Sequence, residues 1–372
     1  MLLRRAALPL LSILLACSTA GPTEPGPGGE ESTAVETPEA TTEDRPYLGV
    51  LFAGDTHFNW AIATIQSERG ALAPVEAIRP LFQAADIRVL NLETSLSDRG
   101  RPFTRKHYIF NASPDNARVL THLGVDVAIL GNNHSMDMGA EGLVRTVESL
   151  RRVGIASVGA GSSDSESYGP LLLSLGDRRV ALLSYSAIGT PEMFSAANRP
   201  GVAQATNAIV YQVGQATRLA NHVIVSMHWG SEYFTAPDPA QVALAHRIID
   251  AGAVAVIGHH PHIPHGVERY RNGIICYSLG NFLFGSINQD QDHNLVVRLD
   301  FDREQPVLRQ VRFFPVFGRY RDGGNEPRLL GPGPAREFWR TFYLQTRSLS
   351  EPTARDLRML PDGSAVLAIV SG

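Results

Sequence analysis

Cysteine is almost missing from this sequence: the 372 residues include only Cys17 and Cys276. So low a count excludes a disulfide framework of the kind that stabilises small secreted domains. It also excludes a metal site built from several thiolates. Cys276 lies in the apolar run 274–277, where we expect a buried and chemically inert thiol.

Two further absences limit the class of protein. After residue 20, no apolar run approaches the roughly 20 residues that a membrane-spanning helix needs. Charges of both signs are scattered along the chain, the net charge is −4, and there is no basic stripe or arginine-rich arm. Nucleic acid is therefore not an expected partner. With 44% hydrophobic residues, the chain is long enough to bury a large core.

Residues 1–17 have the pattern of a secretory signal. Arg4 and Arg5 precede an apolar stretch over residues 6–16, the length expected of such a signal. Residues 14–17 (Leu-Leu-Ala-Cys) resemble the lipobox of bacterial lipoproteins. The resemblance implies cleavage before Cys17 and acylation of this residue, which would anchor an exported protein to a membrane in the periplasm or at the cell surface. The alternative is an ordinary signal peptide with a coincidental cysteine.

Residues 18–46 consist almost entirely of Ser, Thr, Ala, Gly, Pro and Glu. Such a segment cannot bury enough apolar surface to offset its ordering entropy, so it predicts a flexible acidic linker. One folded domain is expected over residues 47–372.

In this domain, short apolar runs alternate with helical patterns. Strands are expected at residues 48–53, 86–92, 125–130, 153–158, 171–185 (a hairpin), 223–227, 254–257, 308–316 and 365–370. Helices are expected at residues 75–83, 141–152, 209–219, 239–250 and 335–346. Strands interleaved with helices predict an α/β layered fold.

Five of the apolar runs end in polar side chains of the same few kinds. In chain order these are Asp55 and His57, Asn91 and Glu93, Asn132 to His134, His228, and His259 to His262. In α/β sheets the ligand crevice lies beyond the carboxyl ends of the strands. We therefore expect these side chains to converge on one crevice.

The residue types indicate the chemistry of that crevice. Carboxylate oxygens, amide oxygens and neutral imidazoles are suitable ligands for Zn²⁺, Mn²⁺ or Fe. The set contains more ligands than one ion needs, which favours two divalent ions roughly 3.5–4 Å apart that share a carboxylate. Such a pair lowers the pKa of a bridging water and stabilises the attacking and leaving groups. The sequence predicts a two-metal hydrolytic site and leaves the identity of the metals open.

Each part of this pattern also has a plain structural interpretation. Asp55 could be an ordinary turn residue, as could Asn132 and Asn133, and His228 could simply pack with its neighbour. The run over residues 259–262 is harder to explain as packing, because it places three of the twelve histidines within four residues.

Six motifs occur in order along the chain. They are Gly54-Asp55, Asn91-Leu92-Glu93, Asn132-Asn133-His134-Ser135-Met136-Asp137, His228-Trp229-Gly230-Ser231-Glu232-Tyr233, Gly258-His259-His260-Pro261-His262 and Tyr277-Ser278-Leu279-Gly280-Asn281-Phe282. Together they resemble the CapA family of poly-γ-glutamate capsule synthesis proteins, which is similar to the calcineurin-like metallophosphoesterase superfamily. The resemblance extends from about Tyr47 to about Pro332. It implies a four-layer α/β/β/α sandwich.

The resemblance also implies roles for individual residues. Asp55 would bind the first metal, and Glu93 would take the position of the bridging carboxylate. The other implied ligands are Asn133, His228 and His260 for the second metal and His262 for the first. His134 falls where the superfamily has a general acid that protonates the leaving group.

Three departures from the family pattern affect these roles. His57 stands where CapA proteins often have an apolar residue; it restores the superfamily's Asp-x-His pair, so we expect it to bind the first metal. Glu93 is one methylene longer than the usual Asp. The Gly-His-x-His motif has an extra histidine, which leaves an ambiguity between His259 and His260. Alternation along an extended segment selects His260 and His262, and His259 would then orient a ligand.

Other polar residues carry weaker signals. His265 and His293 could face the substrate, but we expect them to be merely exposed. Glu232 and Tyr233 could shape the pocket or be structural. Arg105 and Lys106 could meet an anionic substrate or lie in a solvated loop.

The ligand set and the expected lipid anchor predict a surface-anchored, metal-dependent hydrolase that acts on an anionic polymer or a small anionic substrate. The resemblance implies that this substrate belongs to the capsule or envelope, such as poly-γ-glutamate. The ligands do not distinguish a phosphoester from an amide bond. The alternative is a non-catalytic factor that binds, exports or tethers the capsular polymer. The complete ligand set argues against this alternative, because a pure binder has little need for seven metal ligands.

Overall fold

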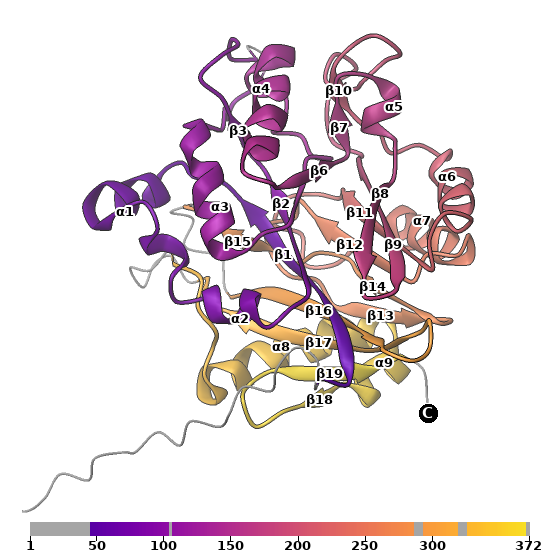
Figure 1. The fold of residues 1–372 in the computed structure, drawn as a ribbon. Coiled ribbons are helices and arrows are strands. Elements are labelled where there is room, and N and C mark those ends of the chain that lie inside the picture. Colours follow the sequence, from indigo (N-terminus) through magenta and orange to yellow (C-terminus); the bar gives the residue numbers. More distant parts are fainter. Residues whose placement is uncertain (1–44, 104–105, 286–292, 319–325, 370–372) are drawn as a thin grey trace, which may run out of the picture. The chain divides into compact units, whose positions relative to one another are not determined.

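The computed structural model describes residues 45–103, 106–285, 293–318 and 326–369 (Figure 1). The predicted signal peptide, Cys17 and nearly all of the predicted linker lie outside the described residues. One compact unit spans Arg45–Gly372, so it begins two residues before the predicted domain boundary. In the described part of the chain, no helix combines the length and the apolar character that crossing a bilayer requires.

Within the described residues, the larger sheet has nine strands and is centred on β1 (Tyr47–Thr56). β1 pairs in parallel with β2 (Ile87–Leu92) and antiparallel with β16 (Asn294–Asp302). The other strands are β5 (Val127–Ile129), β6 (Ala156–Val158), β15 (Asn281–Leu283), β17 (Leu308–Val316), β18 (Arg358–Met359) and β19 (Ala365–Ala368). The strand order is β18-β19-β17-β16-β1-β2-β5-β6, with β15 paired to the end of β1.

The second sheet has six strands in the described chain, in the order β13-β14-β12-β11-β9-β8. They are β8 (Leu171–Leu175), β9 (Arg178–Ser186), β11 (His222–His228), β12 (Ala255–His259), β13 (Val267–Tyr270) and β14 (Gly273–Cys276). β9, β11, β12 and β14 run parallel to one another. Two short pairs lie outside the large sheets: β3 (Ser95–Leu96) with β4 (Asn111–Ala112), and β7 (Ala160–Gly161) with β10 (Gly201–Val202).

Alternating residues of the strands divide the core into layers. Val50 and Phe52 of β1 belong to a cluster shared with the second sheet, whereas Leu51 and Ala53 pack against helices on the opposite face. Those helices are α1 (Ala61–Arg69), α2 (Arg79–Gln83), α3 (Ala117–Leu123) and α4 (Gly139–Arg152). The outer face of the second sheet packs in the same manner against α6 (Ile209–Ala216) and α7 (Pro239–Asp250).

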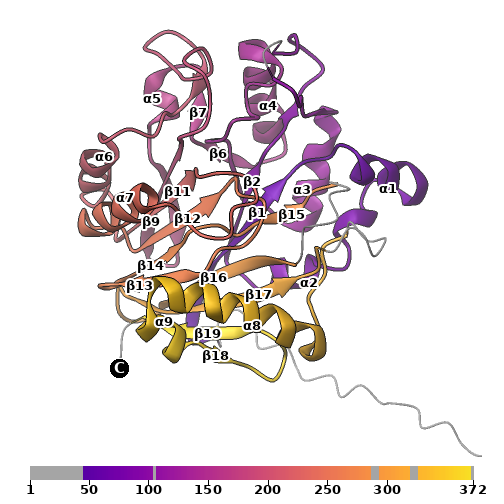
Figure 2. The same ribbon diagram turned by 180° about the vertical axis from the view of Figure 1, so that it is seen from behind.

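The domain is therefore a four-layer α/β/β/α sandwich, as the family resemblance implied (Figure 1). Helix α8 (Pro332–Leu349) adds Phe338, Trp339 and Phe342 to the core between the sheets, and α9 (Glu351–Asp356) follows it (Figure 2). A short helix, α5 (Asp164–Ser167), precedes β8.

Several sequence expectations need correction. The helix predicted over residues 75–83 is in fact a 3₁₀ turn (Ala73–Val75) followed by the short helix α2, because Pro80 can begin a helix but cannot donate a hydrogen bond within one. His265 and His293 are both buried rather than exposed. The imidazole of His265 contacts the carbonyl of Phe234 at 2.7 Å, which satisfies a polar group that burial would otherwise penalise. The predicted burial of Cys276 is confirmed, and burial raises the pKa of its thiol.

Candidate metal centre

The candidate site lies where strand ends from both sheets meet. In the nine-stranded sheet, Asp55 lies near the end of β1, Glu93 directly follows β2, and the Asn133–His134 pair comes after β5. His228 ends β11, and the histidine run continues from β12, in the six-stranded sheet. The expected convergence of these strand ends thus brings together residues separated by as many as two hundred positions.

Two glycines permit this close approach. A Cβ atom on Gly54 would lie 2.0 Å from the carbonyl oxygen of Gly280, and one on Gly258 would lie 1.9 Å from that of Tyr277. Real side chains do not tolerate such distances, so only glycine fits at these two strand ends. The polar residues that follow are placed by backbone packing rather than by loop flexibility.

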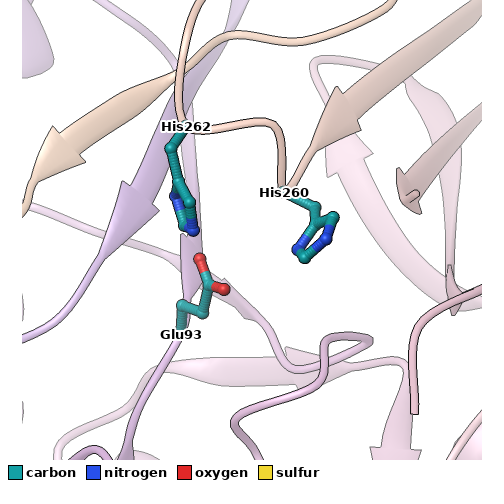
Figure 3. Close-up of side chains that lie close together, drawn as sticks. All are labelled: Glu93, His260 and His262. Atoms are coloured by element: carbon teal, nitrogen blue, oxygen red, sulfur yellow. The ribbon is translucent and has the colours of Figure 1, made fainter. Parts of the chain in front are cut away.

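Two groups of side chains have the geometry to hold a metal ion. Glu93, His260 and His262 form one group, and Asp55, Glu93 and His228 form the other; within each, the ligand atoms lie within 4.8 Å of one another. Figure 3 shows the carboxylate of Glu93 beside the imidazole of His262, with His260 turned toward the same space. Glu93 is common to both groups, as a carboxylate shared by two ions would be.

The environment of Glu93 is unfavourable for an anion without a cation nearby. Its side chain is fully buried, and within the described residues neither carboxylate oxygen has a hydrogen-bond partner. Burial, followed by the charge of Asp55, raises the pKa of Glu93 well above its usual range. Buried carboxylates are normally paired or bound to metal, so this residue fits a cation site.

Asp55 occupies the centre of the polar cluster. Its Oδ1 accepts a hydrogen bond from Asn91 at 2.8 Å and lies 3.3 Å from Nδ1 of His259. Its Oδ2 lies 3.2 Å from Nδ1 of His262 and accepts a bond from the backbone N–H of His260 at 3.2 Å. Burial raises the pKa of Asp55, but the adjacent imidazoles outweigh burial and hold it well below its usual range. Asp55 is therefore a carboxylate at neutral pH.

Asn133 and His228 contact each other directly. Oδ1 of Asn133 lies 2.9 Å from Nε2 of His228, which in turn lies 3.5 Å from Oε1 of Glu93. Neighbouring Asn132 has a supporting role: its amide bonds to Asn91, and its carbonyl oxygen accepts from the backbone of His134. Burial lowers the pKa of His228 well below its usual range, so the imidazole is neutral and able to bind a metal.

His134 is oriented by two residues to which the sequence gave no firm role. Its Nδ1 lies 2.7 Å from Oδ2 of Asp137, and its Nε2 lies 4.0 Å from Oε1 of Glu93. Nζ of Lys106 lies 2.5 Å from Oδ1 of Asp137 and donates to the carbonyl oxygen of Asn133 at 2.7 Å. Burial lowers the pKa of His134 to about 4, although Asp137 opposes the shift. The spacing of His134 and Asp137, three residues apart within one motif, is a signal that could have revealed their contact.

His57 lies beside the cluster among aromatic rings, and its role as a ligand stays a prediction. Its ring centroid lies 4.0 Å from that of Phe284 and 4.5 Å from that of Phe110. Nδ1 accepts a hydrogen bond from the backbone N–H of Asn59 at 3.1 Å, and Nε2 has no partner in the described chain. Neither metal-binding group of described residues includes His57.

The histidine run does not have the extended backbone from which its ligands were inferred. φ is +96° at His260 and +61° at His262, so the chain turns sharply after β12. This turn, rather than strand alternation, brings both imidazoles to Glu93. His259 remains within β12, is fully buried and faces Asp55, so it adjoins the cluster without belonging to either group of three.

Comparison with known proteins places the chain in a family. The family described as bacterial capsule synthesis protein PGA_cap matches residues 49–286. The chain belongs to this family. Every candidate ligand, from Asp55 to His262, lies within the matched range.

Relatives of this capsule synthesis protein family carry similar descriptions. The PGA biosynthesis protein CapA of Bacillus subtilis is 29% identical over 252 residues, which cover 67% of this chain and 66% of that protein. A Mycobacterium tuberculosis protein described as a probable polyglutamine synthesis accessory protein is 39% identical over 210 residues, which cover 53% of this chain and 55% of that protein. The chain thus matches between about half and two thirds of the length of these relatives.

A solved structure with a related arrangement is that of a novel phosphatase from Mycoplasma pneumoniae. It is 12% identical, the match covers 73% of this chain and 94% of that chain, and the TM-score is 0.42. A likeness of this degree says nothing about the chemistry of the site.

In this capsule synthesis family member, a pocket of about 800 Å³ opens beside the metal centre. His134 and His262 contribute to its lining, and Glu232 and Tyr233 lie along it. The pocket thus opens onto His262, one of the candidate ligands, and onto His134.

Proposed function

We propose that this chain is a two-metal hydrolase that acts on a capsule or envelope polymer, or on a precursor of one. The observation that carries the proposal is Glu93: it is fully buried, its oxygens have no hydrogen-bond partner in the described chain, and it belongs to both metal-binding groups. The family's description as capsule synthesis proteins supports the biological setting.

The residues would divide between two ions. Glu93 would be shared, and the other ligands would be Asp55, His57 and His262 for the first ion and Asn133, His228 and His260 for the second. Bound divalent ions would supply a water of lowered pKa and neutralise charge on the scissile group. Zn, Mn and Fe all fit a set of carboxylate, amide and imidazole ligands.

His134 is the proposed proton-transfer residue. Its Nδ1 faces Asp137, so the imidazole is held with Nε2 directed toward Glu93 and the substrate space. Asp137 is itself fixed by Lys106 and by the backbone N–H of Phe110, which donates to Oδ2 at 2.6 Å. This support limits the motion of the imidazole, which proton transfer to a leaving group requires.

Metal analysis and turnover test the proposal together. The purified protein should bind about two equivalents of Mn, Fe or Zn and hydrolyse a generic phosphodiester or a γ-glutamyl peptide until a chelator removes the metal. His134→Ala should lower kcat by about 10²–10⁴-fold with metal content unchanged. A wild-type protein that stays metal-free in the presence of these ions would contradict the proposal, and loss of metal in His134→Ala would make His134 a ligand.

A second candidate function is a non-catalytic factor that binds or tethers the polymer. The relatives' descriptions favour it, because they mention biosynthesis and an accessory role rather than hydrolysis. A protein that binds two metal ions yet hydrolyses neither class of substrate would support this candidate.

Location at the envelope also belongs to the proposal. Anchoring through lipid on Cys17, and the periplasm or cell surface as the site of action, rest on the sequence pattern of residues 1–17. Labelling with a fatty-acid analogue, which should disappear in Cys17→Ser, tests the anchor.

A further inference from the structure

The pocket beside the metal centre is walled by aromatic rings that contact one another. The ring centroids of Trp60 and Phe110 lie 4.9 Å apart at 85°, and those of Trp60 and Tyr108 lie 5.8 Å apart at 80°. Phe284 continues the wall, 5.9 Å from Phe110 at 89°. Because neighbouring rings pack edge to face, they form one continuous aromatic surface.

This surface is open to solvent at its outer part. Trp60 is 42% exposed and Tyr108 is 54% exposed, whereas Phe110 and Phe284 are buried at the inner end near the metal centre. A large exposed tryptophan next to a polar site is a feature typical of ligand contact rather than of packing.

Backbone strain gives an independent indication. Among the described residues other than glycine, positive φ occurs at five: Trp60, Tyr233, His260, His262 and Arg271. The first four line this pocket or bind in the metal centre. Strained conformations persist where function requires a side chain in a particular place. The strain at Trp60 and Tyr233 therefore marks the two sides of the pocket as functional.

The charge of the pocket limits what it can accept. Glu232 lies on the side of Tyr233, and no described side chain forms a salt bridge with its carboxylate. Apart from His134 and His262, no lining residue in the described chain is basic. A run of γ-glutamyl carboxylates would meet the carboxylate of Glu232 and aromatic faces along the outer part of the pocket. Lys106, which adjoins His134, is already paired with Asp137.

The shape of the aromatic wall distinguishes between two uncharged or cationic kinds of ligand, a sugar ring and an organic ammonium ion. An organic ammonium ion is held by rings that surround a common centre, whereas Trp60, Tyr108, Phe110 and Phe284 contact one another and form a single wall. A flat, hydroxyl-rich ring fits better: its C–H face packs on the aromatic wall, while its hydroxyl groups donate to the carboxylate of Glu232.

We infer that the substrate is a phosphoester of a neutral carbohydrate, with the sugar bound between the aromatic wall and Glu232. The inference rests on the proposed function, since it places the phosphoryl group at the metal centre. Hydrolysis adds water across the bond between phosphorus and the sugar oxygen, which releases the sugar with a free hydroxyl and leaves the phosphorus with a new oxygen.

Binding of sugars without phosphate tests the inference independently of catalysis. The full-length protein is titrated with chitotriose, maltotriose, adenosine and tetra-γ-glutamate by calorimetry. At least one of the two neutral oligosaccharides should bind, and Trp60→Ala and Glu232→Gln should each weaken that binding at least tenfold. Tyr108→Ala provides a second variant in case Trp60→Ala fails to fold.

Tyr211→Ala is the matched control, because Tyr211 is an aromatic residue on α6 that is 69% exposed and outside the pocket. This variant should bind the oligosaccharide like the wild type.

Turnover then links the pocket to the metal centre. With metal present, kcat/KM for N-acetylglucosamine 1-phosphate should exceed that for methyl phosphate at least tenfold, and Trp60→Ala should raise KM for the sugar phosphate. If neither oligosaccharide binds, or if adenosine or tetra-γ-glutamate binds instead, the inference is wrong. If an oligosaccharide binds at Trp60 but no phosphoester is hydrolysed, the proposed function fails while the sugar site stands.

Discussion

Glu93 would destabilise the candidate metal centre in the absence of a bound cation. Its carboxylate is buried without a hydrogen-bond partner in the described chain, and the neighbouring charge of Asp55 adds to the penalty. Replacing an unpaired buried charge with a neutral side chain of the same shape should therefore stabilise the metal-free fold.

We predict that Glu93→Gln raises the Tm of the chelator-treated protein and abolishes the rise in Tm that metal produces in the wild type. The wild type should gain about 2.7 kcal/mol when the metal concentration is a hundred times its Kd. Differential scanning calorimetry with and without metal measures both effects. Glu68→Gln, at an exposed position, is the control. A metal-free Glu93→Gln protein less stable than the wild type would show that the carboxylate has a partner within the protein.

His222 offers a residue-scale prediction away from the metal centre. It is buried at the start of β11, its ring centroid lies 4.4 Å from that of Phe301, and burial lowers its pKa to about 4. The unfolded chain takes up the proton near the ordinary value of about 6.5, while the folded protein resists it until about pH 4. His222 therefore favours the folded state above pH 6.5, and this contribution is lost as the pH falls from 6.5 to 4.

The loss should amount to about 3 kcal/mol over that range. Urea unfolding of the metal-free protein at a series of pH values should show a flatter acid decline in His222→Gln than in the wild type. His107→Gln, at an exposed position, should follow the wild-type curve. Parallel curves for His222→Gln and the wild type would contradict the assignment.

At the scale of elements, the close contact between the ends of β1 and β15 gives a paired prediction. Gly54→Ala would place a Cβ 2.0 Å from the carbonyl oxygen of Gly280, so β1 must shift away from its neighbour. We expect lower stability and loss of metal, because Asp55 follows directly. Gly214→Ala, within helix α6 where an added Cβ meets nothing within 4 Å, should instead stabilise the protein by about 0.5–1 kcal/mol. Unfolding free energies and metal content of the two variants test the contrast.

The elements that the sequence predicted well have local signals. Helix α7 has its predicted bounds, because Asp238 and Gln241 form a capping box and Pro239 occupies the first turn. The hairpin expected over residues 171–185 is formed by β8 and β9, with its turn at Gly176. Helix α1 was missed because Ile62 is its one fully buried side chain, so it has no apolar face to produce a helical period.

The sequence predicted those residues of the candidate site that lie at the ends of strands. Asp55, Glu93 and His228 could be found because each follows an apolar run. The contact of Lys106 with Asp137 could not, since it depends on how a loop folds back over 31 residues. The turn at His260 and His262 was also beyond prediction, because positive φ at these residues is a strained state with no local sequence signal.

For the molecule as a whole, the important feature is that the candidate ligands come from both sheets. Asp55 lies in one sheet and Glu93 directly follows it, whereas His228 lies in the other sheet and His260 in the loop after it. Metal binding should therefore slow backbone hydrogen exchange at the ends of β2 and β12 together, and much less at the distant edge strand β18. Exchange monitored by mass spectrometry, with and without chelator, measures this. Protection confined to one sheet would mean that the ions do not connect the two.

Ions held between the sheets would act as removable cross-links. A protein outside the cytoplasm cannot be refolded by ATP-dependent chaperones. The lifetime of its folded state therefore depends on how rarely its two sheets separate. Proteases would then degrade the metal-free form fastest, and the amount of this protein would follow the local supply of metal.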